Sequence, residues 1–414
     1  MKQFSEKLMI FLSCFTVLFI IYSPVVFIPY AFHDDFNFFP MLTRKELNLQ
    51  YLYDSHYFLV FIGRPLGAWI MTIFNWLITS FLGLAIARFV LILTLSLCSY
   101  LYMCFLRKHV YTRLQSFLIS IAIFTLPSFE IIVSWVGAGY ILYAILLGIS
   151  SAFILDGIED GKRDRRSNLK RFNCFCLLFF ALLIYPSGAM FYWVIPAHVL
   201  FLSMPTGMRY IQNKMRDFFA IGFMAMLLYA CKLALMKAYY ANRVGSFYNP
   251  YVLTAHYFEK LRWFISDPLA NSLNLWNIFP TLNRTCIVSF FLFATCVLLA
   301  VKIFGQVNDQ QKRKQDFFWF VINSGALLCL ILLSFLPKLA ATSDAGFYRC
   351  TSALSAIVII AFIWSIEQWQ ALLFKSFNKG IFVALLFVLC LYGGTQANKT
   401  IFSYRALPSF VESS

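Results

Sequence analysis

Charged residues are scarce in this chain. They make up 13% of its 414 residues, whereas 61% are hydrophobic and the mean hydropathy is +0.74. Such a balance is too apolar for a soluble fold, and it is typical of a polytopic membrane protein. The shortage of charge therefore excludes the soluble globular classes.

The sequence also has no CxxC pair. Its 11 cysteines fall almost wholly within apolar runs, which indicates small buried side chains and neither a disulfide framework nor a metal site.

A cleavable signal peptide is missing as well. The first apolar run, Leu8 to Tyr30, is long enough to span a bilayer and has no small-residue cleavage pattern before His33. We expect it to remain as the first transmembrane helix.

What the chain does have is an excess of basic residues. There are 34 Lys and Arg against 18 Asp and Glu, for a net charge of +16. The basic residues lie mainly in short connections between apolar runs, where they set membrane orientation, so we expect no nucleic-acid partner. Lys2 and Lys7 favour a cytoplasmic N-terminus. The same rule places residues 31–67, 237–283 and 397–414 on the outer side.

The alternation of apolar runs and basic loops predicts one all-α membrane unit over residues 1–414, with about 11 spans of about 20 residues each. Residues 36–63 mix aromatic and charged side chains, which predicts interfacial helices in the first outer loop. We expect a half-embedded helix over Ala68 to Phe81, before a second span. Shorter apolar runs predict further spans over residues 114–126, 189–203 and 285–301.

Two adjacent carboxylates, Asp34 and Asp35, follow the first apolar run directly. Such a pair can be an ordinary helix cap, but ionisable groups at the membrane edge of so apolar a chain are candidates for function. Further polar residues from separate connections are expected on the same outer face. They are Arg64, Glu130, Tyr185, Arg284, Lys338, Asp344 and Arg349.

This set of residues suits the transfer of a sugar from a lipid phosphate. A carboxylate can accept the proton of the attacking hydroxyl, while Arg and Lys hold the phosphate as it leaves. We therefore expect catalysis by Asp34 and Asp35. We expect phosphate binding at three cations, Arg64, Lys338 and Arg349. We expect acceptor binding at two further side chains, Glu130 and Tyr185.

Each of these assignments has an ordinary alternative. The three cations can be snorkelling anchors at helix ends, and the two acceptor candidates can be interface residues. The second carboxylate of the pair can hold the acceptor. It can also hold a divalent cation, although two Asp side chains are few ligands, so no cofactor is indicated.

His33-Asp34-Asp35 after the first span, followed by Gly63-Arg64-Pro65-Leu66 and a late outer Arg349, resembles the serotype-converting O-antigen glucosyltransferases of the Gtr type. These are polytopic members of the GT-C class. The resemblance implies a GT-C-like bundle in the bacterial inner membrane, undecaprenyl-phosphate-glucose as donor and a sugar of the lipid-linked O-antigen as acceptor. It also implies inverting periplasmic transfer with an Asp base, and dependence on a polyprenyl-phosphate glucosyltransferase and a flippase.

Two other functions fit the same composition. A flippase or transporter for a lipid-linked saccharide would bind a similar headgroup without chemistry. Transporters, however, tend to hold polar groups at the bilayer midplane, whereas the acids here cluster outside the spans, which favours the enzyme. An O-antigen polymerase would also use outer loops, and it stays an alternative.

Overall fold

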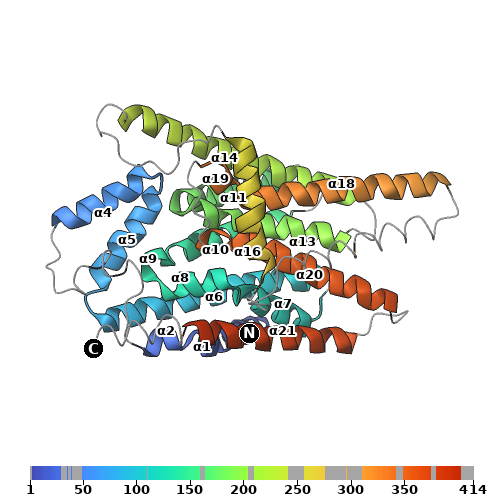
Figure 1. Ribbon diagram of the computed structural model, residues 1–414, viewed down its shortest axis with the longest axis horizontal. Helices are drawn as coiled ribbons and strands as arrows, with labels where there is room; N and C mark the ends of the chain where they lie inside the picture. Colours follow the sequence, from blue (N-terminus) through green and yellow to red (C-terminus); the bar gives the residue numbers. More distant parts are fainter. Residues whose placement is uncertain are drawn as a thin grey trace.

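The chain folds into a bundle of long helices that run roughly side by side (Figure 1). The computed structural model describes residues 2–28, 35, 39, 49–109, 111–158, 164–203, 209–240, 256–275, 295, 310–341, 348–373 and 379–401. These residues are 91% helical and include no strand. The expectation of an all-α polytopic membrane protein is therefore confirmed.

The helices follow one another closely along the chain. The first part contains α1 (Lys2–Tyr22), α2 (Pro24–Phe27), α4 (Leu49–Phe61), α5 (Pro65–Leu77), α6 (Phe81–His109), α7 (Arg113–Phe124), α8 (Pro127–Ser134), α9 (Val136–Gly139) and α10 (Ile141–Asp156). The second part contains α11 (Arg165–Ile184), α12 (Pro186–Ala189), η2 (Met190–Trp193), α13 (Val194–Ser203), α14 (Arg209–Tyr240), α15 (Tyr257–Phe264), η3 (Ile265–Leu269), α16 (Ala270–Leu273), α18 (Gln310–Ser334), α19 (Leu336–Leu339), η4 (Tyr348–Cys350), α20 (Ser352–Leu373) and α21 (Lys379–Thr400).

Seven helices of the described residues are long and apolar enough to cross a membrane. An eighth crossing is formed if α7 and α8, which meet at an angle of 64°, count as one broken span. The expected count of about 11 spans, at about 20 residues each, stays a prediction. The expected span over residues 285–301 lies outside the described residues, except for Thr295. The run 189–203 begins with the last residue of α12 and continues through η2 and α13.

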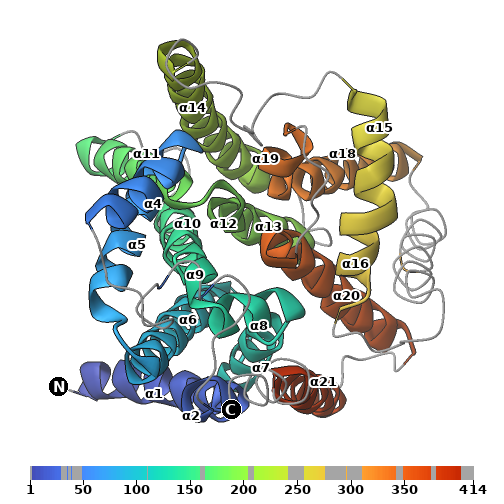
Figure 2. The same cartoon turned by 60° about the vertical axis from the view of Figure 1, so that its left-hand side comes forward.

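Helix α10 lies in the middle of the bundle, where α6, α11, α12 and η2 pack around it (Figure 2). Small residues on α10 allow this close approach, as is usual where membrane helices meet. A Cβ at Gly148 would lie 2.9 Å from the carbonyl oxygen of Ala189 and 3.3 Å from the amide nitrogen of Tyr192. The absence of a side chain at Gly148 thus brings the backbone of α12 and η2 against α10.

Two short helical segments have apolar faces that the bundle leaves uncovered. Helix α5 exposes Trp69, Ile73 and Trp76 by 60, 55 and 62%, and their spacing puts them on one face of the helix. Segment α15–α16 runs across the long helices and exposes Tyr257 and Phe258 (Figure 1). Because neither helix α5 nor helix α15 is long enough to cross, both suit the membrane interface. A helix is thus present where the half-embedded one was expected, but α5 begins three residues before Ala68 and ends at Leu77, and its depth in the membrane stays a prediction.

The described cysteines are all free, and most are at least partly buried. Cys231 of α14 and Cys329 of α18 are exposed. The interpretation of the cysteines as buried was therefore wrong for these two. Their helices present apolar faces outward, which is where a bundle meets lipid, and a thiol is tolerated there as a small apolar group.

The end of the bundle formed by the last turns of α6 and α10 is held by buried ion pairs. Asp156, the final residue of α10, is buried and lies 2.6 Å from Lys108 Nζ and 2.7 Å from Lys214 Nζ. His109 Nε2 lies 3.1 Å from the same carboxylate. Since these partners belong to α6 and α14, one carboxylate ties three long helices together. We call this the Asp156 end.

Candidate functional site

The opposite end of the bundle carries the residues singled out from the sequence, beginning with Arg64. Gly63 has a φ of +87°, a left-handed conformation that favours glycine, and it turns the chain from α4 into α5. Arg64 then caps α5, and its Nη1 donates a hydrogen bond of 2.9 Å to the Tyr140 hydroxyl. The Arg64 guanidinium also lies 4.3 Å above the Tyr185 ring. Two tyrosines therefore fix the orientation of this cation.

Helix α14 holds the same turn from the other side. The Gly63 carbonyl accepts hydrogen bonds from the Tyr229 hydroxyl at 3.3 Å and from Lys232 Nζ at 3.1 Å. A Cβ at Gly63 would lie 2.5 Å from Leu233 Cδ2 and 2.9 Å from the Tyr229 oxygen. The turn thus needs glycine both for its backbone conformation and for its contact with α14. Because Arg64 follows this turn directly, the contact also fixes the position of its backbone relative to α14.

Lys338 and Arg349 approach Arg64 from late in the sequence. Burial lowers the pKa of the Lys338 ammonium, and the like charges of Arg64 and Arg349 lower it further. Arg349 lies over the Trp135 ring at 4.3 Å. Its neighbour Cys350 has its Sγ 3.3 Å from the Tyr185 hydroxyl. Lys338 is therefore close enough to Arg64 and to Arg349 for each of their charges to act on it, and Tyr185 links Arg64 to Cys350, the neighbour of Arg349. We call Arg64, Lys338 and Arg349 the cation cluster.

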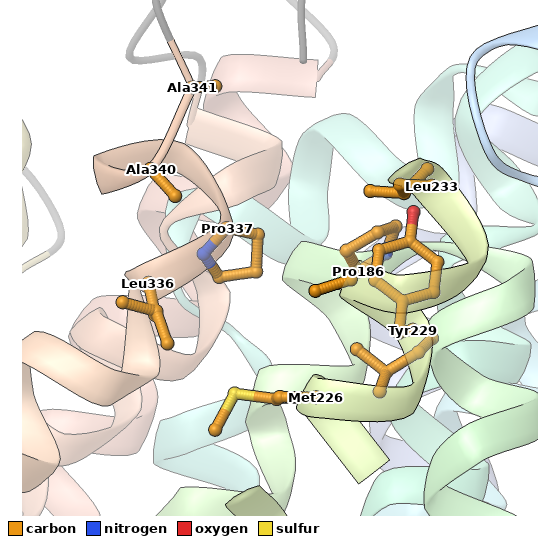
Figure 3. A pocket seen from close by; sticks show the side chains of 10 residues that line it. Pro186, Met226, Tyr229, Leu233, Leu336, Pro337, Ala340 and Ala341 are labelled. Atoms are coloured by element: carbon orange, nitrogen blue, oxygen red, sulfur yellow. The ribbon is translucent and has the colours of Figure 1, made fainter. Parts of the chain in front are cut away.

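An apolar cavity of about 140 Å³ lies between α14 and α19 (Figure 3), next in sequence to two residues of this site. Side chains of α14 face those of α19 across it, and its lining consists of Leu182, Pro186, Met226, Tyr229, Ala230, Leu233, Leu336, Pro337, Ala340 and Ala341. Pro337 directly precedes Lys338, and Pro186 directly follows Tyr185. Pockets that enclose a whole ligand measure roughly 300–1,000 Å³. This cavity can therefore take one part of a larger apolar molecule.

Asp35 belongs to a separate buried arrangement at the same end of the bundle. Its side chain is fully buried, and its Oδ2 lies 3.4 Å from Arg88 Nη2. Its Oδ1 accepts a hydrogen bond of 2.9 Å from the Gly137 amide. Arg88, itself 1% exposed, also donates to the Ser134 carbonyl at 3.1 Å and to the Val25 carbonyl at 3.4 Å. An arginine inside an apolar span is thus paired with an acid, as burial of a charge requires.

Glu130 and Tyr185, the candidates for acceptor binding, are both 3% exposed. Glu130 lies on α8, which packs against η4, the segment that carries Arg349. Tyr185 contacts Arg64 directly. Because both side chains are covered by protein, contact between either of them and an acceptor sugar requires neighbouring side chains to move.

The structure thus gathers Arg64, Tyr185, Lys338 and Arg349 into one place, and it brings Asp35 and Glu130 to the same end of the bundle. Asp34, Arg284 and Asp344 lie outside the described residues. Sequence reasoning missed the roles of Arg88, Tyr140 and Trp135. A signal existed for Arg88, since a lone arginine within a long apolar run needs a buried partner. Nothing in the sequence pairs Tyr140 or Trp135 with a cation.

The arrangement can hold an anion that carries an apolar chain. Arg and Lys side chains bind phosphate through charge-assisted hydrogen bonds, and three of them at one site would offset the charge of a phosphate. Over the described ranges, no three His, Cys, Asp or Glu side chains come together in a way that could hold a metal ion. The cation cluster is therefore the feature of the described site that best fits an anionic group.

Comparisons with protein-family models, with curated proteins and with solved structures find no match to this chain.

Proposed function

We propose that this protein is an integral-membrane glycosyltransferase of the GT-C class. In this proposal it transfers a glucosyl residue from undecaprenyl-phosphate-glucose to a sugar of the lipid-linked O-antigen, on the periplasmic side of the bacterial inner membrane. The observation that carries the proposal is the cation cluster together with the apolar cavity. A polyprenyl phosphate has the matching chemistry, since its headgroup is anionic and its chain is apolar.

The reaction needs one base and one site for the leaving phosphate. A carboxylate of the acid pair Asp34 and Asp35 takes the proton of the acceptor hydroxyl as the oxygen attacks the anomeric carbon. The bond between that carbon and the phosphate oxygen breaks, and the electron pair leaves with the phosphate. The cation cluster stabilises the departing anion, so no general acid is required. Attack opposite to the leaving group inverts the anomeric configuration.

The donor must be delivered to the outer face of the membrane before the protein can use it. The proposal therefore includes two partner activities, a polyprenyl-phosphate glucosyltransferase that makes the donor and a flippase that moves it across. It assigns Glu130 and Tyr185 to the acceptor side of the site, next to the cation cluster. An orientation with the Asp156 end in the cytoplasm agrees with the basic residues gathered there.

Transfer from radiolabelled undecaprenyl-phosphate-glucose to a lipid-linked O-antigen acceptor tests this proposal with purified protein. We expect incorporation by the wild type and a loss of roughly 10²-fold to 10⁴-fold on removal of the general base. Asp34→Asn and Asp35→Asn are the variants, and full activity in both would refute the mechanism. Glu259→Gln is the matched control, because this carboxylate of α15 is 81% exposed and lies 3.8 Å from His256, three residues before it.

The same assay separates the two other functions. A flippase or transporter binds the donor but incorporates no label. A polymerase joins O-antigen units and leaves the glucose on its carrier. Absence of incorporation by the wild type, in the presence of both substrates, would therefore reject the glucosyltransferase and return these alternatives.

A further inference from the structure

We infer that the two acids of the pair have different roles, and that Asp35 is a positioning residue that acts through Arg88. This inference rests on the proposed function, and it leaves Asp34 as the general base. In it, the Asp35–Arg88 pair fixes the junction between α8 and α9, and this junction carries the ring on which Arg349 lies.

The environment of Asp35 is that of a structural carboxylate. Its exposure is 0%, and both of its oxygens are occupied, one by Arg88 and one by the Gly137 amide. A general base must come within hydrogen-bonding reach of the hydroxyl that it deprotonates. A carboxylate that is fully covered and already bonded at both oxygens does not meet that condition without dismantling the pair.

The pair spans a break in the helical backbone. Helix α8 ends at Ser134, and Trp135 has an extended conformation with φ −105° and ψ 100°. Backbone groups next to such a break have lost their helical partners. Arg88 donates to the carbonyl of Ser134 on one side, and Asp35 accepts from the amide of Gly137 on the other. The Arg88 guanidinium therefore bonds to a carbonyl at the end of α8, and the Asp35 carboxylate bonds to an amide in the segment that follows.

Between these two bonded residues stands Trp135, whose ring lies 4.3 Å from the Arg349 guanidinium. The ring is 5% exposed, so its place depends on the backbone that carries it. A shift of the break moves the indole, and with it the support for one of the three cations. The Asp35–Arg88 pair thus couples the first outer loop to the phosphate-binding side of the site through the backbone that carries Trp135.

The inference distinguishes loss of a base from loss of a support. Asp35→Asn leaves Arg88 as a buried charge without its acid, and Arg88→Gln leaves Asp35 without its cation. The double variant Asp35→Asn/Arg88→Gln removes both charges and retains amide groups that can bond to Ser134 and Gly137. If Asp35 positions the site, the double variant should have a higher unfolding midpoint and a higher kcat/KM than either single variant. If Asp35 is the base, no change at Arg88 can restore activity.

The experiment measures the thermal unfolding midpoint, binding of undecaprenyl phosphate, and the KM and kcat of transfer for all three variants. We expect each single variant to lower the midpoint, to weaken binding of undecaprenyl phosphate and to raise the donor KM about tenfold or more. We expect the double variant to recover kcat/KM at least tenfold over either single variant. Asp34→Asn combined with Arg88→Gln should show no such recovery.

Two results from the three variants would overturn the inference, and a further one can come from Arg88→Lys. One is an Asp35→Asn protein with wild-type midpoint, donor KM and lipid-phosphate binding whose kcat alone has fallen. The other is strict additivity of the two single changes in the midpoint and in kcat/KM. Arg88→Lys keeps the cation but loses the forked donors. It replaces Arg88→Gln if that variant does not accumulate, and an unchanged donor KM in Arg88→Lys would also count against the inference.

Failure of the proposed function is separable from failure of this inference. A wild-type protein that transfers no glucose rejects the glucosyltransferase. The unfolding midpoints of the same four proteins still decide whether Asp35 and Arg88 act as one unit, with non-additivity supporting the pair and additivity rejecting it.

Discussion

Neutralising Lys338 should have opposite effects on stability and on ligand binding. In the substrate-free protein this ammonium is disfavoured by burial and by the like charges of Arg64 and Arg349, which is why its pKa is lowered. Lys338→Gln removes that repulsion, so we expect a thermal unfolding midpoint equal to or above that of the wild type. The same change removes a donor to the phosphate.

The size of the binding effect follows from the chemistry of the contact. A hydrogen bond to a charged group contributes about 1.5–3 kcal/mol. Since each 1.4 kcal/mol is a factor of about ten, the affinity for undecaprenyl phosphate should fall roughly 10-fold to 100-fold. Titration of the purified protein with undecaprenyl phosphate in detergent measures this directly, and a parallel thermal melt gives the midpoint.

The matched control is Lys399→Gln on α21. Lys399 is exposed, and the adjacent Asn398 donates to the Ile21 carbonyl, so Lys399 lies at the end of α21 that packs beside α1. This control should change neither affinity nor midpoint. A Lys338→Gln protein that binds undecaprenyl phosphate as tightly as the wild type, or that melts well below it, would refute the reasoning about the cation cluster.

Four further predictions concern pH, packing, the Asp156 end and topology. Protonated Lys338 is disfavoured in the folded protein, so the free energy of unfolding should rise with pH between its lowered pKa and the ordinary pKa of 10.5. Binding of undecaprenyl phosphate should decline over the same pH window, because Lys338 loses its charge. Thermal melts and binding titrations at a series of pH values check both trends, and Lys338→Gln should flatten both. Gly67→Ala places a Cβ 2.7 Å from the Ile184 carbonyl and 3.3 Å from the Tyr140 ring, so it should lower the unfolding midpoint and weaken donor binding. Gly325→Ala, with nothing within 4 Å, should do neither. Asp156→Asn leaves Lys214 buried without its acid and should destabilise the protein by about 3–5 kcal/mol in denaturant unfolding, and a loss below about 1 kcal/mol would contradict the role of this carboxylate. A periplasm-dependent reporter fused after Asn37 should be active, and activity of a cytosolic reporter there would reverse the proposed orientation.

The long helices could be predicted where one apolar run makes one crossing. Helices α6, α10 and α14 each contain such a run, and basic residues in or beyond their last turns mark where they end. The first run, 8–30, is broken, because α1 ends at Tyr22 and Pro24 begins α2. The breaks between consecutive helices were harder to predict from the sequence. The run 114–126 ends at a 64° bend because Pro127 starts a new helix, and the run 189–203 changes helix type inside an apolar stretch. Hydropathy sums do not register backbone breaks between apolar residues, so they do not distinguish a straight span from a broken one.

The site was predictable in its residue types but not in its pairings. Outward placement of Arg64, Lys338 and Arg349 followed from topology, and the structure brings them together. The tyrosine and tryptophan rings that hold two of these cations come from distant connections, and no periodicity links them. The different roles inferred for Asp34 and Asp35 depend on the burial of Asp35 against Arg88, a residue of α6. That contact is known only once the packing of α6 is known. Sequence gives no such contact.

The central claim is that the acid pair drives glucosyl transfer onto O-antigen. The mass of the O-antigen repeat tests this most directly, measured in cells that produce either the wild type or Asp34→Asn at equal membrane abundance. The account predicts a repeat heavier by one hexose with the wild type and an unmodified repeat with the variant. An unmodified repeat with the wild type, or the same added hexose with Asp34→Asn, would contradict it.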